Sequence, residues 1–266
     1  MSISLNLEWS TSHSEPAQQR AGLRFGDRGT HTSRTMMLRE LSELLEVTPR
    51  DADHDAYVEA IVAENVLGKE TTSNRRSTKQ RLSELYGLDP QMPIFRVLLR
   101  LWDLDEAGRP LLALLCALAR DPLLRATAAT ILPMTPGQEL LRSDMTASIT
   151  EGTGGRLKDS VTDKVARNAG SSWTQSGHLE GRVRKIRQPV RPTAGASAFA
   201  VWLGALQGRA GESLLDSAWA KVLDVGPSDL LDQVLRAKQL GLLRARTGGG
   251  VVEIHADGID PAVGGS

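Results

Sequence analysis

The sequence predicts a mainly α-helical protein, in which an N-terminal helical domain precedes a C-terminal winged helix-turn-helix-like domain with a short β-hairpin. Three observations lead to this prediction. The composition is rich in Leu and Ala and only 4% aromatic, which favours helices. Apolar residues recur at three- and four-residue steps from Met36 onward. Near the C-terminus, three helical segments are followed by two β-prone runs separated by Gly248–Gly250, a hairpin signal.

The chain is long enough for one large core or two smaller ones, with 266 residues of which 40% are hydrophobic. Three glycines within Thr150–Arg156 interrupt the apolar pattern and mark the best internal boundary. The predicted organisation is an irregular arm at 1–33 that includes a short strand at Ile3–Leu7, a helical domain at 34–150, a basic segment and winged-helix-like domain at 156–256, and a flexible tail at 257–266.

Four or more closely packed helices are expected in the helical domain. Tyr57, Ile61 and Val62 recur at helical spacing and mark the buried face of one of them. Ile94–Trp102 is a strongly apolar helix. Leu111–Ala119 has no polar side at all, so we expect this helix to be buried all round.

Capping residues predict where several helices begin and end. Ser77 or Thr78 is expected to cap a helix that Gly87 terminates, because glycine suits the left-handed position after a helix. Asp121–Pro122 is a cap followed by proline, and Thr135–Gln138 has the spacing of a capping box. We therefore expect further helices to start at these two places.

A polar and basic segment follows the predicted boundary. A helix is expected over Leu157–Ala169 and is expected to end at Gly170. Pro189 and Pro192 then argue for extended backbone or an edge strand. Trp173 could stack on a base, but the role of a half-buried loop anchor is the stronger interpretation.

The C-terminal part has the clearest pattern. Ala198–Leu206 marks one helix and Leu214–Leu223 a second, while Ser228 can cap a third that Gly241 ends. The order of helix, turn, helix and glycine-tipped hairpin is that of a winged helix, in which the third helix would be the recognition helix.

The chain is formally neutral, with 32 basic and 32 acidic residues, but the charges are segregated. Acidic residues dominate between Glu40 and Glu64. Basic residues gather in three separate clusters, and such clusters suit a polyanion because each neutralised phosphate releases counterions. The predicted DNA-binding residues are Arg75, Arg76, Lys79 and Arg81 in the first cluster, Arg182, Arg184, Lys185, Arg187 and Arg191 in the second, and Arg236, Lys238, Arg244 and Arg246 in the third.

Each cluster also has a structural interpretation. Arg75 and Arg76 could pair with acids such as Glu84, and the second cluster could dock on the acidic N-terminal helices of the same chain or of a dimer. Arg236 and Lys238 could complement the dipole of a helix end. Three clusters in a neutral protein nevertheless favour a polyanion partner.

The sequence contains no motif of an enzyme, and it predicts neither a cofactor nor a metal. The five histidines have no metal-ligand spacing, and Cys116 lies in an apolar run that indicates a core residue. A single cysteine excludes a disulfide framework and fits a reducing cytoplasm. The longest apolar stretch is too short for a membrane span, and the N-terminus lacks the pattern of a signal peptide, so we expect a soluble cytoplasmic protein.

The order of several segments resembles the BrxA family of bacterial BREX phage-defence systems. The segments are ENVLGKETTSNRRSTKQRLSELYGLD, LLALLCALARDPLL, SSWTQSGHLEGRVRKIRQ and LLDSAWAKVLD, within roughly residues 35–225. The resemblance implies a small, mostly helical, non-enzymatic protein that binds double-stranded DNA. It implies an operon setting with a methyltransferase, an ATPase and a phosphatase-like protein, and it brings no catalytic residues.

The function predicted from the sequence is therefore non-catalytic double-stranded DNA binding, largely through phosphate contacts, in a bacterial anti-phage defence system. Two alternatives stay open: a protein–protein adaptor subunit of a defence complex, and a winged-helix transcriptional repressor. Sequence preference and oligomeric state, including a homodimer, are also left open.

Overall fold

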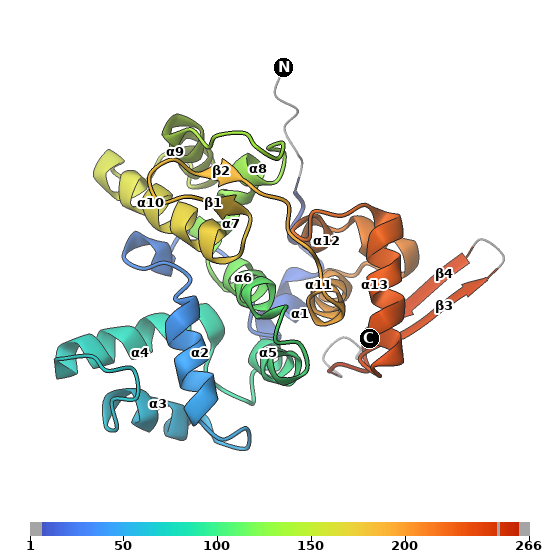
Figure 1. The fold of residues 1–266 in the computed structure, drawn as a ribbon, viewed down its shortest axis with the longest axis horizontal. Coiled ribbons are helices and arrows are strands. Elements are labelled where there is room, and N and C mark those ends of the chain that lie inside the picture. The colour runs from blue at the N-terminus through green and yellow to red at the C-terminus, as the bar shows by residue number, and fades with distance from the viewer. Residues whose placement is uncertain (1–6, 249–250, 261–266) are drawn as a thin grey trace.

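Helices make up most of the fold, which the computed structural model describes for residues 7–248 and 251–260 (Figure 1). The first half contains α1 (Glu15–Arg20), the 3-10 helix η1 (Thr30–Thr32), α2 (Leu38–Val47), α3 (His54–Val62), α4 (Thr72–Tyr86), α5 (Pro93–Leu104), α6 (Arg109–Arg120), α7 (Pro122–Ala126) and α8 (Ala128–Ile131). The second half contains α9 (Arg142–Gly152), α10 (Asp159–Gln175), β1 (Leu179–Glu180), β2 (Ile186–Arg187), α11 (Ala194–Leu206), the 3-10 helix η2 (Gly211–Asp216), α12 (Ala218–Lys221), α13 (Pro227–Gln239), β3 (Arg244–Gly248) and β4 (Val251–His255). The predicted mainly α class is confirmed.

The helices α5 and α6 form the centre of the core, as their apolar patterns predict. Every residue of α6 from Leu111 to Arg120 is buried, so the expectation of a helix buried all round is confirmed. The ring of Phe95 on α5 packs edge-on against Tyr57 of α3 at a centroid distance of 5.3 Å. The core continues into the C-terminal part, because α11 packs against both α5 and α6.

The start of α4 differs from the prediction. The helix begins at Thr72, and the Thr71 hydroxyl oxygen accepts a hydrogen bond of 3.1 Å from the Asn74 amide. Neither Ser77 nor Thr78 is the cap, since both lie inside the helix. The first turns are polar and lack the apolar period that would reveal them in the sequence. The predicted end is confirmed, with Gly87 at a φ of 93°.

Of the two predicted helix starts, one is confirmed and the other is wrong. An Asp121 carboxylate oxygen accepts from the amides of Leu123 and Leu124 and caps α7. At Thr135 the Gln138 side chain does accept from the backbone amide, but the chain turns there instead of entering a helix. Residues 137–140 run extended beside β2, and α9 begins at Arg142.

The helix α10 runs through Gly170, where the sequence predicts its end, and continues to Gln175. The absence of a side chain at Gly170 leaves room for Lys185, whose Cδ would lie 3.3 Å from a Cβ at this position. Trp173 therefore lies on a helix and not in a loop, and it is fully buried. Its indole nitrogen donates a 2.8 Å hydrogen bond to the hydroxyl of Thr127, so the indole ring is not available for stacking on a base.

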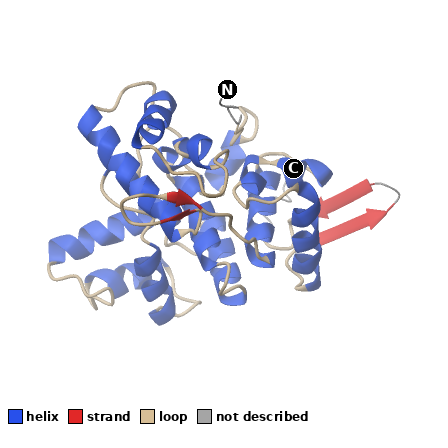
Figure 2. Ribbon diagram, turned by 45° about the horizontal axis from the view of Figure 1, so that its top comes forward, coloured by secondary structure: helices blue, strands red, loops and turns tan. Residues whose placement is uncertain are grey.

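The C-terminal part follows the predicted order with local corrections. The second helix is split into η2 and α12, and α13 starts at Pro227 after Gly226, so Ser228 is not its cap. The two-stranded antiparallel sheet β3–β4 is confirmed, with Gly248 opposite Val251. The hairpin extends from one end of the molecule (Figure 2).

The described parts of the predicted irregular arm and flexible tail contain helices and buried residues. The arm carries α1 and η1, and Trp9 packs edge-on against Trp219 at 4.7 Å. The strand predicted at Ile3–Leu7 lies outside the described residues except for Leu7. In the predicted flexible tail, Ile259 and Asp260 are buried against α5, where Asp260 pairs with Arg96. The rest of that tail, 261–266, is not within the described part.

Among the residues that the structure describes, no helix combines the length and the apolar character required to span a membrane.

Candidate nucleic-acid interface

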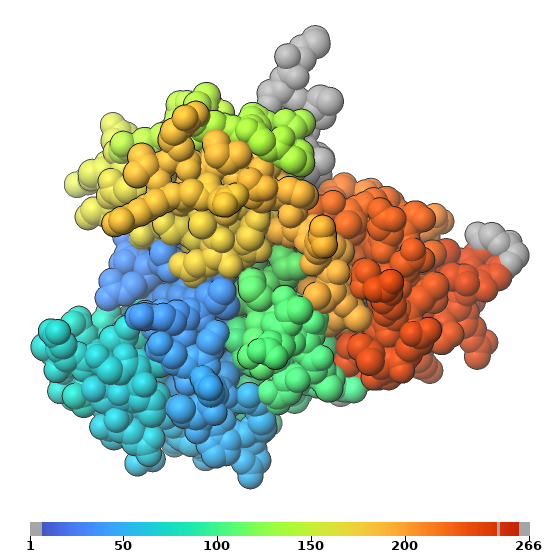
Figure 3. Space-filling view, in the orientation of Figure 1, coloured from blue at the N-terminus to red at the C-terminus, as the bar shows by residue number. Residues whose placement is uncertain are grey.

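The three predicted basic clusters lie in different parts of the molecule. Helix α4 is at one end of the longest axis and the β3–β4 hairpin is at the other, in both ribbon views (Figures 1 and 2). The β1–β2 segment lies between them. The space-filling view shows the same separation on the surface (Figure 3). A straight duplex would have to run along the whole molecule to touch the first and third clusters together.

The α4 cluster is largely engaged by its own chain. The Arg75 guanidinium donates to the backbone oxygens of Lys69 and Val62, and Arg81 pairs with Glu84 at 2.8 Å. Burial alone would raise the pKa of Glu84, but hydrogen bonds from Thr30, Arg81 and Gln80 outweigh it and lower the pKa. The expected pairing of Arg75 or Arg76 with Glu84 is not observed, because Glu84 is paired with Arg81. Arg76 is exposed and Lys79 half-buried, and neither forms an ion pair within the described residues.

The second cluster is divided by the fold. Arg182 and Arg191 are exposed and have no carboxylate partner within the described residues. Arg184 is exposed but forms an ion pair of 2.6 Å with Glu139. The Lys185 ammonium donates to the Thr174 hydroxyl at 2.9 Å, and burial lowers its pKa.

Arg187 does not belong to the predicted DNA-binding surface. Its side chain is 3% exposed and pairs with Asp224, and it also donates to the backbone oxygens of Ile131, His178 and Gln188. A guanidinium held in this way cannot reach a phosphate. The prediction grouped Arg187 with its exposed neighbours. A strand alternates its side chains between two faces, but in so dense a basic run the sequence does not reveal which face is buried.

Two cations that the sequence reasoning missed lie beside this cluster. A hollow of about 150 Å³ beneath Val183 is rimmed by Arg142, Arg167 and Lys185, while Leu140 and Met145 form part of its apolar lining. Arg167 is exposed on the outer side of α10, where the apolar period of that helix would have placed it. Arg142 pairs with Asp163, and no local pattern indicates its position near the loop.

Three residues of the third cluster line a larger hollow. This C-terminal groove, about 730 Å³, lies between the end of α13 and the β3–β4 hairpin. Its lining residues are Lys238, Gly241, Leu243, Arg244, Ala245, Arg246, Glu253, His255 and Gly258. Arg244 pairs with Asp257, whereas Lys238 and Arg246 have no ion-pair partner within the described part of the chain. The groove therefore presents two cations that an anionic ligand can engage.

The hairpin register explains why these cations share one side. Arg244 lies opposite His255 and Arg246 opposite Glu253, all on the exposed side, while Ala245 and its partner Ile254 are buried. Arg236 is exposed on α13 but does not line the groove.

The first turns of α13 carry the opposite charge. Asp229 and Asp232 are both exposed and lie on the same side of the helix as Arg236, because residues three and four apart are neighbours. Phosphate approach is thus disfavoured at the start of α13 and favoured at its end.

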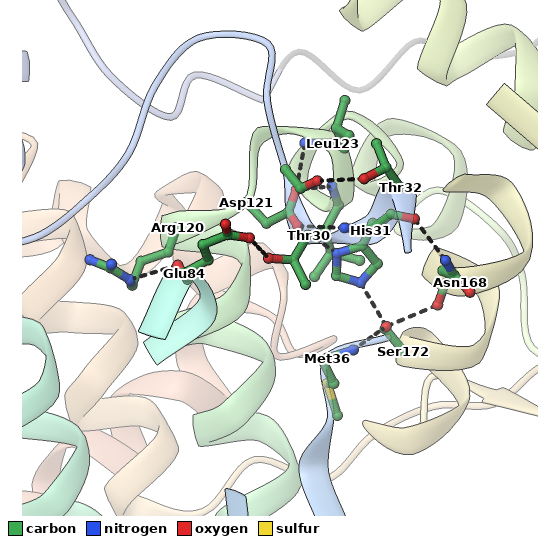
Figure 4. Close-up of polar contacts among 12 residues, drawn as sticks. Thr30, His31, Thr32, Met36, Glu84, Arg120, Asp121, Leu123, Asn168 and Ser172 are labelled. Atoms are coloured by element: carbon green, nitrogen blue, oxygen red, sulfur yellow. Dashed lines mark hydrogen bonds and ion pairs between the residues drawn. The ribbon is translucent and has the colours of Figure 1, made fainter. Parts of the chain in front are cut away.

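A buried array of His31, Asp121 and Ser172 forms a polar cluster in the interior (Figure 4). His31 Nδ1 lies 2.7 Å from the Asp121 carboxylate and Nε2 lies 2.8 Å from the Ser172 hydroxyl. The order of groups is that of a serine hydrolase, but all three side chains are at most 1% exposed. The Ser172 oxygen also accepts from the Met36 amide at 2.8 Å. The array joins the N-terminal arm to α7 and α10, and a substrate has no access to it in this conformation.

The buried environment has the expected effects on titrating groups. For Asp121, burial would raise the pKa, but the charge and hydrogen bonds of His31 and the helix amides hold it below its usual value. Burial raises the pKa of the Cys116 thiol to about 12. Within the described residues, no three His, Cys, Asp or Glu side chains are placed to hold a metal ion.

Comparison with known proteins adds no relative: no protein-family model matches the chain, and no curated protein matches it.

Proposed function

We propose that this protein is a non-catalytic double-stranded DNA-binding protein that acts largely through phosphate contacts. The C-terminal groove carries the proposal, because Lys238 and Arg246 line one hollow and have no ion-pair partner within the described residues. Gly241 and Gly258 on its wall have no side chain to hinder a close approach of a backbone. Contacts to phosphates carry no base information, so binding is expected to depend little on sequence.

The assignment of the C-terminal part as a winged helix is part of the same proposal. The order α11, α12, α13, β3 and β4 is that of a winged helix, with α13 as the recognition helix and β3–β4 as the wing. The acidic start of α13 argues against deep insertion of this helix into a major groove. The wing and the end of α13 would supply the phosphate contacts instead.

The cellular setting is proposed from the sequence resemblance to the BrxA family. We place the DNA binding in the cytoplasm of a bacterium, as part of an anti-phage defence complex with further subunits.

Fluorescence anisotropy of a short labelled random duplex tests the proposal, with the full chain titrated at salt concentrations from about 50 to about 200 mM. Binding should weaken linearly on a log–log plot, with a slope of about −0.9 for each phosphate contacted. No binding at the lowest salt concentration would refute the proposal.

Charge reversal locates the interface. The double variant Lys238→Glu and Arg246→Glu should lose most of the affinity and should flatten the salt slope. The matched control reverses Arg20 and Arg34, two exposed cations outside the three clusters, and should bind like the wild type. Equal losses in the two variants would mean that net charge, and not the groove, determines binding. Circular dichroism of both variants verifies that they are folded.

An adaptor subunit is the second candidate, because large apolar side chains are exposed near the groove. Leu240 is 61% exposed and Val251 is 59% exposed. If they contact a partner protein, the double variant Leu240→Ser and Val251→Ser should release co-purifying subunits after nuclease treatment and leave DNA anisotropy unchanged. Retention of those subunits by the variant would contradict the adaptor function of this surface.

A further inference from the structure

The loop of residues 181–185 between β1 and β2, called here the β1–β2 loop, is anchored at its base by backbone hydrogen bonds. The amide of Leu140 donates to the Lys185 oxygen at 2.8 Å, and the amide of Arg187 donates to the Gln138 oxygen at 2.9 Å. The segment 137–140 thereby lies along β2 as a third extended segment, and the buried Arg187 anchors the other side of that strand.

The turn itself is restricted as well. Gly181 has a φ of 101°, and a Cβ there would lie 2.0 Å from the Arg184 backbone oxygen. The Lys185 ammonium bridges Thr174 of α10 and the Gly181 oxygen at 2.9 and 3.3 Å. The loop is therefore held in one shape from both ends.

This fixed loop presents an apolar side chain to solvent. Val183 is 92% exposed, the most of any large apolar side chain among the described residues. Its neighbours in sequence are the exposed Arg182 and Arg184. Isolated exposed apolar residues are common on surfaces, but one held at the tip of a braced loop between two arginines is a specific arrangement.

Several cations surround Val183. The hollow that it helps to line is also lined by Arg142, Arg167 and Lys185, of which Arg142 is paired with Asp163. The ion pair of Arg184 with Glu139 joins exposed groups and contributes little to stability, so a phosphate can compete for this guanidinium. The charge complements a polyanion better than an apolar protein pocket.

We propose that the β1–β2 loop is a wedge for duplex DNA. Val183 enters the minor groove and partly unstacks one base step, while Arg182 and Arg184 contact the groove and the phosphates on either side. Apolar side chains that act in this way kink a duplex toward the major groove by about 20–90°. The protein would thus bend the DNA that it binds. This inference rests on the proposed DNA binding and adds a second contact surface to the C-terminal groove.

Fluorescence resonance energy transfer between dyes at the two ends of a short duplex tests the wedge, with anisotropy measured on the same samples. Wild-type protein should raise the transfer efficiency as it binds. Val183→Ser should still bind, with affinity reduced less than about tenfold, but should lose the rise in transfer. The control Val47→Ser changes a valine that is 56% exposed on α2 and should bend the DNA like the wild type.

The arginines are tested by salt dependence. The double variant Arg182→Gln and Arg184→Gln should flatten the log–log slope by about 0.9 for each phosphate that the protein no longer neutralises. The control Arg20→Gln with Arg34→Gln should keep the wild-type slope.

The outcomes separate this inference from the proposed function. Binding without a change in transfer, or equal bending by wild type and Val183→Ser, would overturn the wedge and leave DNA binding standing; an exposed Val183 would then indicate a protein contact. Absence of binding in the anisotropy measurement would overturn both proposals.

Discussion

Arg187 and Asp224 form a buried ion pair that ties β2 to the turn between α12 and α13. The two side chains are 3% and 10% exposed, and a second oxygen of Asp224 accepts from the Val190 amide. Asp224 itself has a φ of 58°, a left-handed conformation that aspartate tolerates better than most residues. The pair therefore links the base of the β1–β2 loop to the helices of the C-terminal part.

Asp224→Asn should destabilise the fold strongly, because it leaves the Arg187 charge buried without a counter-charge. Removing one partner of a buried ion pair costs about 3–5 kcal/mol. Glu139→Gln is the matched control, since it removes the carboxylate from the exposed Arg184 of the β1–β2 loop and should leave the free energy of unfolding nearly unchanged. Urea denaturation measures both free energies of unfolding. Similar losses would show that the burial of Arg187 does not matter energetically.

Thr71→Ala should destabilise α4 by about 1 kcal/mol, because the Asn74 amide loses the acceptor that caps the helix. Ser77→Ala should be close to neutral, since Ser77 lies within the helix and alanine is the best helix former. Thermal or urea denaturation of the two variants compares the positions directly. The reverse ranking would restore Ser77 as the cap.

Stability should fall in mild acid because of His178. Burial lowers its pKa from 6.5 to about 4, so the folded imidazole stays neutral where the unfolded one takes up a proton. A depressed folded-state pKa gives stability that is present above pH 6.5 and is lost as the pH falls toward 4. At about 1.4 kcal/mol for each pKa unit, the loss is about 3 kcal/mol.

His178→Gln removes this titrating group and tests its contribution. The variant should be less stable at pH 7, because the histidine contacts the Ser176 hydroxyl and the Val222 oxygen. Its free energy of unfolding should nevertheless fall less steeply between pH 6.5 and 4. Urea denaturation at several pH values checks this, and parallel curves for the two proteins would count against the neutral buried imidazole.

Cys116 should be inert toward thiol reagents in the folded protein. Its side chain is fully buried, and burial raises the pKa of the thiol to about 12, so almost no thiolate is present at pH 8. A chromogenic disulfide reagent should react rapidly in urea and very slowly without it. Fast reaction of the native protein would mean that α6 opens readily.

The sequence specifies the elements whose signals are local. The helices α5 and α6 follow from their apolar periods, α7 from Asp121–Pro122, and the β3–β4 hairpin from its glycine tip. The start of α4 was not predicted correctly because its first turns are polar. The end of α10 was predicted too early, at Gly170, because a glycine can also make room for a side chain from another segment.

By itself the sequence determined the mainly helical class, the core helices and the existence of three basic clusters, since composition and periodicity fix which faces are apolar. The tertiary structure alone decided which cations remain available. Arg187 and Asp224 are 37 residues apart, and nothing near Arg187 in the chain indicates that partner. His31 and Ser172 likewise meet across 141 residues. The charge and burial of a side chain depend on whatever segment the fold packs against it, and a linear pattern does not record that contact.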